Sequence, residues 1–396
     1  MKKRILTYLK YILICILIIS VVCLGLLYYS GNRVKYNRNY SITSDSLAGE
    51  GPYIVYDQNH IRQIYFNGDQ TEGYALDEEI LTDSIVEVEV NYYPDQTSFK
   101  VQLPIYKHFE PEPATYPEPE KMLVISDIEG GFAAFRNLLL ANGVMNEHYQ
   151  WTYGKAHVAF AGDFVDRGYF VTQVLYLIFH LEQQAEQAGG KVHYILGNHE
   201  IMNMQGDHSY AVGKYTYAAA LLGISQTELY TGNKTFLARW LSSKNTMEKI
   251  GDNLIVHAGL HPDFTDVAFN LDSINQKVRD SYSAVQVMRK GEDRKQFELL
   301  YSFTKSHYWY RGYFKESLDE NDLDNLLNHI QCKRIIVGHT LQSKVKTLYG
   351  SRIVAIDVQH PQEEWGSYFP SATSEALLIE QSSLYRVNLK GKKTAL

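Results

Sequence analysis

The spacing of hydrophobic and polar positions changes several times along the chain, beginning with a long apolar run. From Tyr11 to Tyr29 there are 19 residues without a charge. A helix of this length crosses a hydrocarbon core of about 30 Å, at about 1.5 Å per residue. The run is longer than the apolar core of a secretory signal and has no small-residue cleavage site. We therefore expect a single-pass transmembrane helix near the N-terminus.

The charges on the two sides of this run indicate its orientation. Four Lys or Arg residues precede it and three follow it, with no acidic residue before Asp45. The positive-inside rule then favours a cytoplasmic N-terminus, which places the rest of the chain outside the cytoplasm, in a bacterium in the periplasm or at the cell exterior.

The formal charge of the whole chain is −7, so the part after residue 44 carries −14. Because such an acidic body does not attract a phosphate backbone, we expect no nucleic-acid partner.

Short alternating apolar runs between residues 51 and 106 predict a small antiparallel β unit. The segment FEPEPATYPEPE at 109–120 then carries four of the ten prolines and four glutamates, which predicts a linker without regular structure. The chain accordingly divides into an N-terminal transmembrane anchor (1–40), a small β-rich appendage (41–106), a Pro/Glu-rich linker (107–119) and a catalytic domain (120–396).

After the linker, short apolar strands that end in Asp, Asn or His alternate with helical patterns. The strands are MLVISD (122–127), HVAFAGD (157–163), KVHYILGN (191–198), NLIVHAG (253–259) and RIIVGHT (334–340). The segments 207–250 and 265–330 are mostly helical in pattern, and the last forty residues return to strands. This alternation predicts an α/β layer fold, in which ligands bind at the carboxyl ends of the strands.

The polar residues at these strand ends form a set of potential metal ligands. They are Asp127, Glu129, Asp163, Asn198, His257 and His339. Three carboxylates, one amide oxygen and two imidazoles suit two divalent cations such as manganese, iron or zinc. One carboxylate, best Asp163, would bridge the ions. Two ions roughly 3.5–4 Å apart activate a shared water and clamp both oxygens of an in-line displacement.

Other polar residues in the same segments suit acid catalysis and phosphate binding. His199 directly follows Asn198, too close to coordinate the same ion, and is placed to protonate a leaving oxygen with Asp166 as its orienting partner. Arg167 and Arg311 suit a phosphate clamp, because a planar guanidinium can grip two oxygens of a tetrahedral anion. We expect Asn198 to contribute to phosphate binding beside them.

These residues lie in five short motifs that follow strands in a fixed order. The motifs are AGDFVDRG (161–168), LGNHE (196–200), VHAG (256–259), YRG (310–312) and VGHT (337–340). The set resembles the calcineurin-like metallophosphoesterases, and more narrowly the phosphoprotein-phosphatase superfamily. The segments GNHEIMNMQGD and WYRGYF are most similar to its bacterial Shewanella-like branch. The resemblance covers residues 120–360 and leaves the anchor and the β appendage outside.

The resemblance implies a central β-sandwich flanked by helices, and it implies a role for each site residue. One metal would be held by Asp127, Glu129 and Asp163, and the other by Asp163, Asn198, His257 and His339. His199 with Asp166 would be the acid pair, and Arg167 and Arg311 would bind phosphate.

One position departs from the family pattern D-x-H-G, because this chain reads Asp127-Ile128-Glu129-Gly130. Either Glu129 replaces the histidine as an oxygen ligand, or the first metal site is weakened. An all-oxygen first site would favour manganese or magnesium over zinc. For the pair of ions we expect manganese, with iron, zinc or magnesium as alternatives.

The expected function is hydrolysis of a phosphate monoester, on a phosphoprotein or a small molecule, by attack of a metal-bridging hydroxide. One alternative is a symmetrical dinucleoside-polyphosphate hydrolase, which uses the same metal cradle with different walls. Another is a membrane-tethered binding protein, weakened in catalysis by Glu129.

The aromatic residues at 308–310 either form a wall of the site beside Arg311 or only pack in the protein interior. The sequence does not indicate an oligomeric state.

Overall fold

The computed structural model describes residues 2–30, 34–36, 46–315, 318–362, 367–369 and 373–396. The helices are α1 (Lys2–Ser30), α2 (Phe132–Ala141), α3 (Val171–Gln187), α4 (Asn198–Met204), α5 (Gly213–Leu222), α6 (Phe236–Leu241), α7 (Leu271–Arg279), α8 (Arg294–Tyr301), α9 (Gly312–Lys315) and α10 (Glu320–Ile330), with 3₁₀ turns η1 (Tyr93–Asp95), η2 (Gln226–Leu229) and η3 (Pro262–Asp266). The strands are β1 (Val34–Tyr36), β2 (Glu50–Tyr56), β3 (Ile61–Asp69), β4 (Gly73–Leu81), β5 (Ile85–Tyr92), β6 (Thr97–Pro104), β7 (Thr115–Tyr116), β8 (Lys121–Ile125), β9 (His157–Ala161), β10 (Lys191–Ile195), β11 (Met247–Ile250), β12 (Asn253–Val256), β13 (Arg334–Val337), β14 (Lys346–Leu348), β15 (Ile353–Ala355), β16 (Ser367–Phe369), β17 (Glu375–Glu380), β18 (Ser383–Asn388) and β19 (Thr394–Ala395).

Two six-stranded sheets form the centre of the protein. Their strand orders are β10-β9-β8-β17-β18-β19 and β14-β15-β13-β12-β11-β7. Apolar side chains from both sheets make one buried cluster, with Val124 and Ala159 from the first sheet and Ile255 and Ile336 from the second. On the other side of the first sheet, Phe135 of α2 packs edge-on against Phe160 of β9. The mixed α/β architecture expected from the sequence is therefore confirmed, with sheets layered against helices.

The strand directions explain why the predicted site residues meet. β8 pairs with β9, and β9 with β10, in parallel. In the second sheet β12, β13 and β15 are also parallel neighbours. Because parallel strands end at the same edge of a sheet, the loops after them open toward one another.

The antiparallel strands expected between residues 51 and 106 are present, as β2-β3-β4 and β5-β6. β4 (GYALDEEIL) was not predicted, because its side chains are mostly exposed, three of them are acidic, and they show no period-two alternation. This β unit packs on the rest of the chain through a shared apolar core. A buried ion pair of 2.6 Å between Glu50 Oε2 and Lys214 Nζ joins β2 to α5.

The proline-rich segment is not a free linker. β7, inside it, pairs in parallel with β11, so the expectation of no regular structure is wrong at residues 115–116. Glu112 forms ion pairs with Lys244 at 2.5 Å and with Lys191 at 2.6 Å. The segment packs on the body because β7 extends the edge of a sheet and the Glu112 carboxylate contacts two ammonium groups. Composition alone does not reveal either contact.

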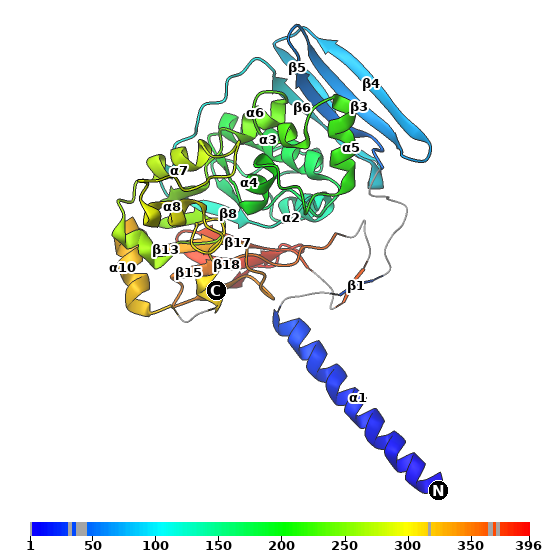
Figure 1. Ribbon diagram of the computed structural model, residues 1–396, viewed down its shortest axis with the longest axis vertical. Helices are drawn as coiled ribbons and strands as arrows, with labels where there is room; N and C mark the ends of the chain where they lie inside the picture. The colour runs from blue at the N-terminus through cyan, green and yellow to red at the C-terminus, as the bar shows by residue number, and fades with distance from the viewer. Residues whose placement is uncertain (1, 31–33, 37–45, 316–317, 363–366, 370–372) are drawn as a thin grey trace.

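The N-terminal helix stands apart from the body (Figure 1). Within α1, residues Leu6–Leu27 form a span with a mean hydropathy of 2.7, none of it buried. Its length and composition suit a membrane span, and a signal sequence near an N-terminus has the same properties.

Candidate active site

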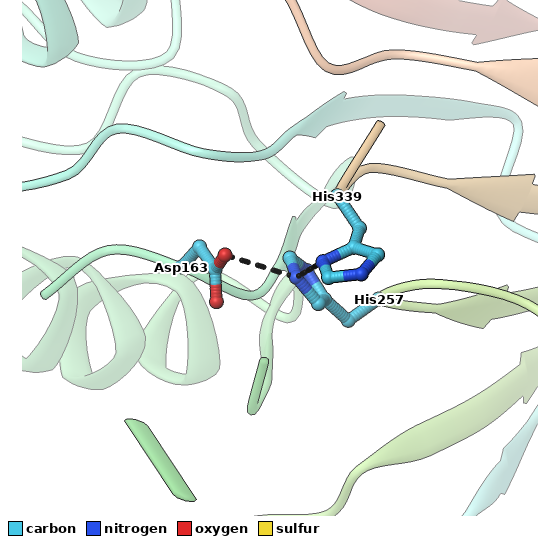
Figure 2. A group of neighbouring side chains, drawn as sticks. All are labelled: Asp163, His257 and His339. Carbon is cyan, nitrogen blue, oxygen red and sulfur yellow. Dashed lines mark hydrogen bonds and ion pairs between the residues drawn. The ribbon is translucent and has the colours of Figure 1, made fainter. Parts of the chain in front are cut away.

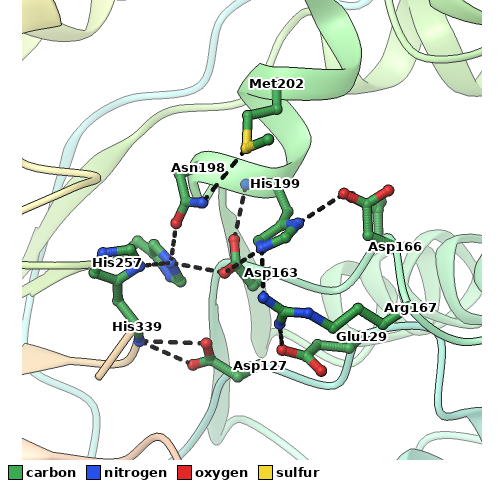
Figure 3. Close-up of polar contacts among 12 residues, drawn as sticks. Asp127, Glu129, Asp163, Asp166, Arg167, Asn198, His199, Met202, His257 and His339 are labelled. Carbon is green, nitrogen blue, oxygen red and sulfur yellow. Dashed lines mark hydrogen bonds and ion pairs between the residues drawn. The ribbon is translucent and has the colours of Figure 1, made fainter. Parts of the chain in front are cut away.

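A cavity of about 420 Å³ lies where the strand ends meet, and most of the predicted site residues line it. Its lining includes Asp127, Glu129, Asp163, Arg167, His199, Arg311 and His339, together with Leu341, Asp357, Val358, Gln359 and Gln362. Of the remaining predicted residues, Asp166 bonds to His199 and His257 bonds to Asp163, both in the lining, and Asn198 bonds to His257 (Figure 3). The structure therefore brings all ten predicted residues to one place.

Three of these side chains form a close group of donor atoms. One atom each from Asp163, His257 and His339 lies within 4.8 Å of the others (Figure 2). His257 Nε2 is 3.0 Å from Asp163 Oδ2 and 3.2 Å from His339 Nδ1. The amide oxygen of Asn198 is also 3.0 Å from His257 Nε2.

The outer hydrogen bonds of the two imidazoles indicate where their protons are. His257 Nδ1 lies 2.8 Å from the carbonyl of Ala161, and His339 Nε2 lies 3.2 Å from the carbonyl of Trp309. Because a carbonyl can only accept, each of these nitrogens carries the proton and the inner nitrogen presents a lone pair. Four electron-rich atoms then converge, an arrangement that requires a cation between them. The residues thus fit a divalent metal with mixed nitrogen and oxygen ligands.

The electrostatics of the group agree with this assignment. Burial disfavours a charged imidazole, but the carboxylate of Asp163 outweighs it and raises the pKa of His257 to about 9. The interior of the group therefore attracts positive charge.

His199 occupies a neighbouring part of the cavity with its own partners. Its Nδ1 is 2.7 Å from Asp166 Oδ2, and Asn203 Nδ2 donates to the other Asp166 oxygen at 2.8 Å. Burial lowers the pKa of His199, but Asp163 and Asp166 outweigh that effect and raise it overall. The two carboxylates thereby ease protonation of this imidazole beside the cavity, which suits a proton donor.

The two arginines differ in their surroundings. Arg167 Nη2 lies 3.0 Å from His199 Nε2, and Arg167 also forms an ion pair with Glu129. The side chain of Arg311 makes no hydrogen bond or ion pair among the residues that the structure describes, and it lines the cavity. Its guanidinium is therefore available to an anion.

Glu129 was expected as a metal ligand, but its carboxylate lies against Arg167 instead (Figure 3). It is outside the close donor group around His257. Asp127 is also outside that group, and its carboxylate accepts the backbone N–H of His339 at 3.1 Å.

The backbone around the cavity is strained at the predicted residues. A positive φ, which disfavours any side chain, occurs at Asp127, Glu129, Asp163, Asp166, Arg167 and His339. Gly197 allows a close approach, because a Cβ there would lie 2.3 Å from Asp163 Oδ1. Such strain persists where packing over-determines it, and it is concentrated at functional sites.

Sequence reasoning missed three residues of the site. Glu200 is buried and accepts the backbone N–H groups of Asp163, Phe164 and Gly197, which fixes two loops to each other. Asn203 holds Asp166 as described above. Asp357 lines the cavity just after β15, and the signal that could have revealed it is the Asp at the end of the predicted strand IVAIDV. Burial, reinforced by the carboxylate of Asp127, raises the pKa of Asp357 well above its usual range.

Comparison with known proteins agrees with this geometry. Residues 120–343, more than half of the chain, match the family described as calcineurin-like phosphoesterase. The chain belongs to the calcineurin-like phosphoesterase family. Shewanella-like protein phosphatase 2 of Arabidopsis thaliana is 25% identical over 289 residues, which are 61% of this chain and 72% of that protein. The resemblance to Shewanella-like phosphatases of the phosphoprotein-phosphatase superfamily is thus confirmed, and so is the enzyme class, a phosphoric ester hydrolase.

A solved structure extends the similarity further along the chain. The cold-active protein-tyrosine phosphatase of a psychrophilic Shewanella species has a TM-score of 0.73 and 29% identity, covering 88% of this chain and 99% of that one. Residues 120–396 are 277 of the 396 and cannot reach 88%. The β unit before residue 107 is therefore shared with that structure, whereas the family match at residues 120–343 leaves it outside, as expected.

Proposed function

We propose that this calcineurin-like phosphoesterase hydrolyses phosphate monoesters on phosphorylated proteins, with two divalent metal ions. One observation carries the proposal. The donor group of Asp163, His257 and His339, the His199–Asp166 pair and the guanidinium of Arg311 all lie at one cavity. Metal ions, when bound, lower the pKa of a water and offset the charge on phosphate. We propose that Asp163, Asn198, His257 and His339 would hold the second metal ion, as expected from the sequence. Asp127 and Asp163 would hold the first.

The chain's own residues supply binding and proton transfer. Arg311 grips phosphate oxygens, and Arg167, steadied by Glu129, binds on the side of His199. His199 donates its proton to the leaving oxygen, while the Asp166 carboxylate holds the ring in place and stabilises its charged form. Each step uses a group that lines the cavity or directly supports one that does.

An aromatic wall beside Arg311 supports a substrate with an aryl group. Trp309 lies edge-on to His339, with ring centroids 5.6 Å apart, and Phe303 lies edge-on to Trp309 at 5.1 Å. Phe303 is 73% exposed, whereas Tyr308 and Tyr310 are buried. A second cavity of about 280 Å³ contacts Phe303, Trp309 and Arg311. We infer that phosphotyrosine in proteins is the preferred substrate, in line with the activity named for the Shewanella structure.

We further propose that α1 anchors the enzyme in a membrane, with the phosphatase domain (120–396) outside the cytoplasm. Apolar side chains exposed along α1, such as Leu13, Leu17 and Ile19, support the anchoring. The four basic residues before the charge-free run that begins at Tyr11 support the orientation.

A substrate panel tests the proposed activity. With Mn²⁺ present, the enzyme is expected to release phosphate from p-nitrophenyl phosphate and from a phosphotyrosine peptide, with a lower kcat/KM for the phosphoserine peptide of the same sequence. Cleavage of diadenosine tetraphosphate in preference to all three would instead identify a dinucleotide hydrolase. No turnover of any substrate, with any metal, would contradict the proposal.

A further inference from the structure

Asp357 is a buried carboxylate without a partner. It is 7% exposed and lines the active-site cavity two residues after β15. Among the residues that the structure describes, no hydrogen bond or ion pair reaches its carboxylate. Even at the wall of a cavity, a largely buried carboxylate is ionised at a cost unless a cation or hydrogen-bond donors compensate its charge. The arrangement therefore points to a ligand that carries positive charge.

The sheet register places Asp357 beside the first metal site. β13 and β15 are parallel, with Val337 opposite Ala355. Two residues further along, His339 and Asp357 leave neighbouring strands at the same level. The backbone N–H of His339 donates to Asp127 Oδ2 at 3.1 Å, so Asp127 lies at this same level. Asp127, after β8 of the first sheet, and Asp357, after β15 of the second, therefore both line the cavity where the two sheets meet.

The first metal site lacks a donor without Asp357. The position where the family pattern has a histidine is Glu129, and its carboxylate is engaged by Arg167. That leaves Asp127 and the shared Asp163, which are too few protein ligands for a tightly held divalent cation.

We infer that Asp357 is the third protein ligand of the first metal ion, together with Asp127 and Asp163, in place of the missing histidine. This inference rests on the proposed two-metal function. Glu129 then positions Arg167 and does not coordinate. The close donor group among the described residues is Asp163, His257 and His339, so the three carboxylates would have to move closer together to hold an ion. A site of three carboxylates prefers Mn²⁺ or Mg²⁺ over softer ions.

Metal stoichiometry tests the inference without reference to catalysis. The full-length protein is stripped with a chelator, titrated with Mn²⁺ by calorimetry, and assayed for bound manganese after gel filtration. We expect two ions for the parent protein and one tightly bound ion for Asp357→Asn, with the other weakened at least about tenfold. Glu129→Gln is expected to keep two. Asp252→Asn is the matched control, because Asp252 is an exposed carboxylate paired with Lys333.

Thermal unfolding in chelator separates a lost ligand from a damaged fold. Removing an unpartnered buried charge leaves the Tm of metal-free Asp357→Asn unchanged or higher, whereas the rise in Tm on adding Mn²⁺ becomes smaller. A lower metal-free Tm would overturn the inference. So would two ions bound by Asp357→Asn at parental affinity, one ion bound by the parent, or loss of an ion from Glu129→Gln alone. Failure of the proposed function has a different signature, namely two bound ions and no hydrolysis of any phosphate ester.

Discussion

At the scale of single residues, the ring of His199 has a partner on each nitrogen. Asp166 holds Nδ1 at 2.7 Å, and Arg167 lies 3.0 Å from Nε2 at the cavity. Because a guanidinium can only donate, Nε2 accepts from Arg167 in this arrangement. Nδ1 is held by Asp166, so Nε2 is the ring nitrogen that would carry the proton for the leaving oxygen.

Replacing His199 by Asn should lower kcat by roughly two to four orders of magnitude for alkyl phosphates, because their leaving oxygen needs a proton. The loss should be much smaller for p-nitrophenyl phosphate, whose leaving group is stable without one. Steady-state kinetics with both substrates provide the measurement, and bound manganese should be unchanged. An equal loss for both substrates, or a loss of metal, would remove His199 from the acid role.

The aromatic wall makes a second prediction at this scale. Phe303→Ala should reduce kcat/KM for a phosphotyrosine peptide about threefold to tenfold, since an aromatic pair contributes about 0.5–1.5 kcal/mol. The phosphoserine peptide should be hydrolysed as before. Val287→Ala is a control, because Val287 is equally exposed, at 75% against 73% for Phe303, and does not line that cavity. An equal reduction for both peptides would argue against an aryl subsite.

The residues of the site could be predicted because chemistry-bearing residues follow strands in short motifs. The partners of those residues could not be predicted. That Glu129 turns to Arg167 depends on how two loops meet, and that Asp357 joins the cavity depends on the register of β13 and β15. Neither relation has a local signal in the sequence.

At the scale of elements, the proline-rich segment shows the limit of composition as a guide. Its prolines exclude helix, but the two residues of β7 still complete the edge of a sheet. β4 was not predicted because it is an exposed edge strand, and such a strand needs no alternation of apolar residues. Strands with a buried face, such as β8 and β9, were predicted because burial imposes a continuous apolar run.

The segment's ion pairs predict a pH-dependent contribution to stability. Burial opposes ionisation of Glu112, but the ammonium groups of Lys244 and Lys191 outweigh it and lower the pKa of Glu112 from 4.5 to about 2. Because the folded pKa is depressed, this stabilisation is present above about pH 4.5 and is lost as the pH falls toward 2.

Glu112→Gln should therefore lower the free energy of unfolding by roughly 3 kcal/mol at pH 7, the cost of leaving a buried ammonium with fewer partners. Urea unfolding at pH 7, 5 and 3 gives the measurement. The difference from the parent should be constant down to about pH 4.5 and smaller at pH 3. A difference that is the same at pH 3 as at pH 7 would show that the pair does not act through charge.

At the scale of the whole molecule, the β unit and the body share one buried core, whereas α1 stands apart. The sequence pattern predicted the anchor, the β unit and the catalytic domain as three separate units. A pattern shows where composition changes along the chain, and it does not show which distant segments contact each other. The apolar run alone was sufficient to predict α1.

Removal of residues 1–40 should accordingly release the protein from the membrane fraction without loss of specific activity. Leu47, which is fully buried, and the β unit remain intact in such a truncated chain. Carbonate extraction of the full-length protein checks the anchoring, and protease protection in intact cells checks the orientation. Extraction of the full-length protein by carbonate would exclude a membrane-spanning α1.

The central claim is that the strand ends of this fold form a cation-dependent phosphatase site. The most direct test is phosphate release from a phosphotyrosine peptide by chelator-stripped protein, before and after addition of Mn²⁺, for the parent and for His257→Ala. We predict no release before addition, recovery in the parent, and no recovery in His257→Ala at equal Mn²⁺. Release by the stripped parent at the metal-loaded rate, or full recovery in His257→Ala, would contradict the claim.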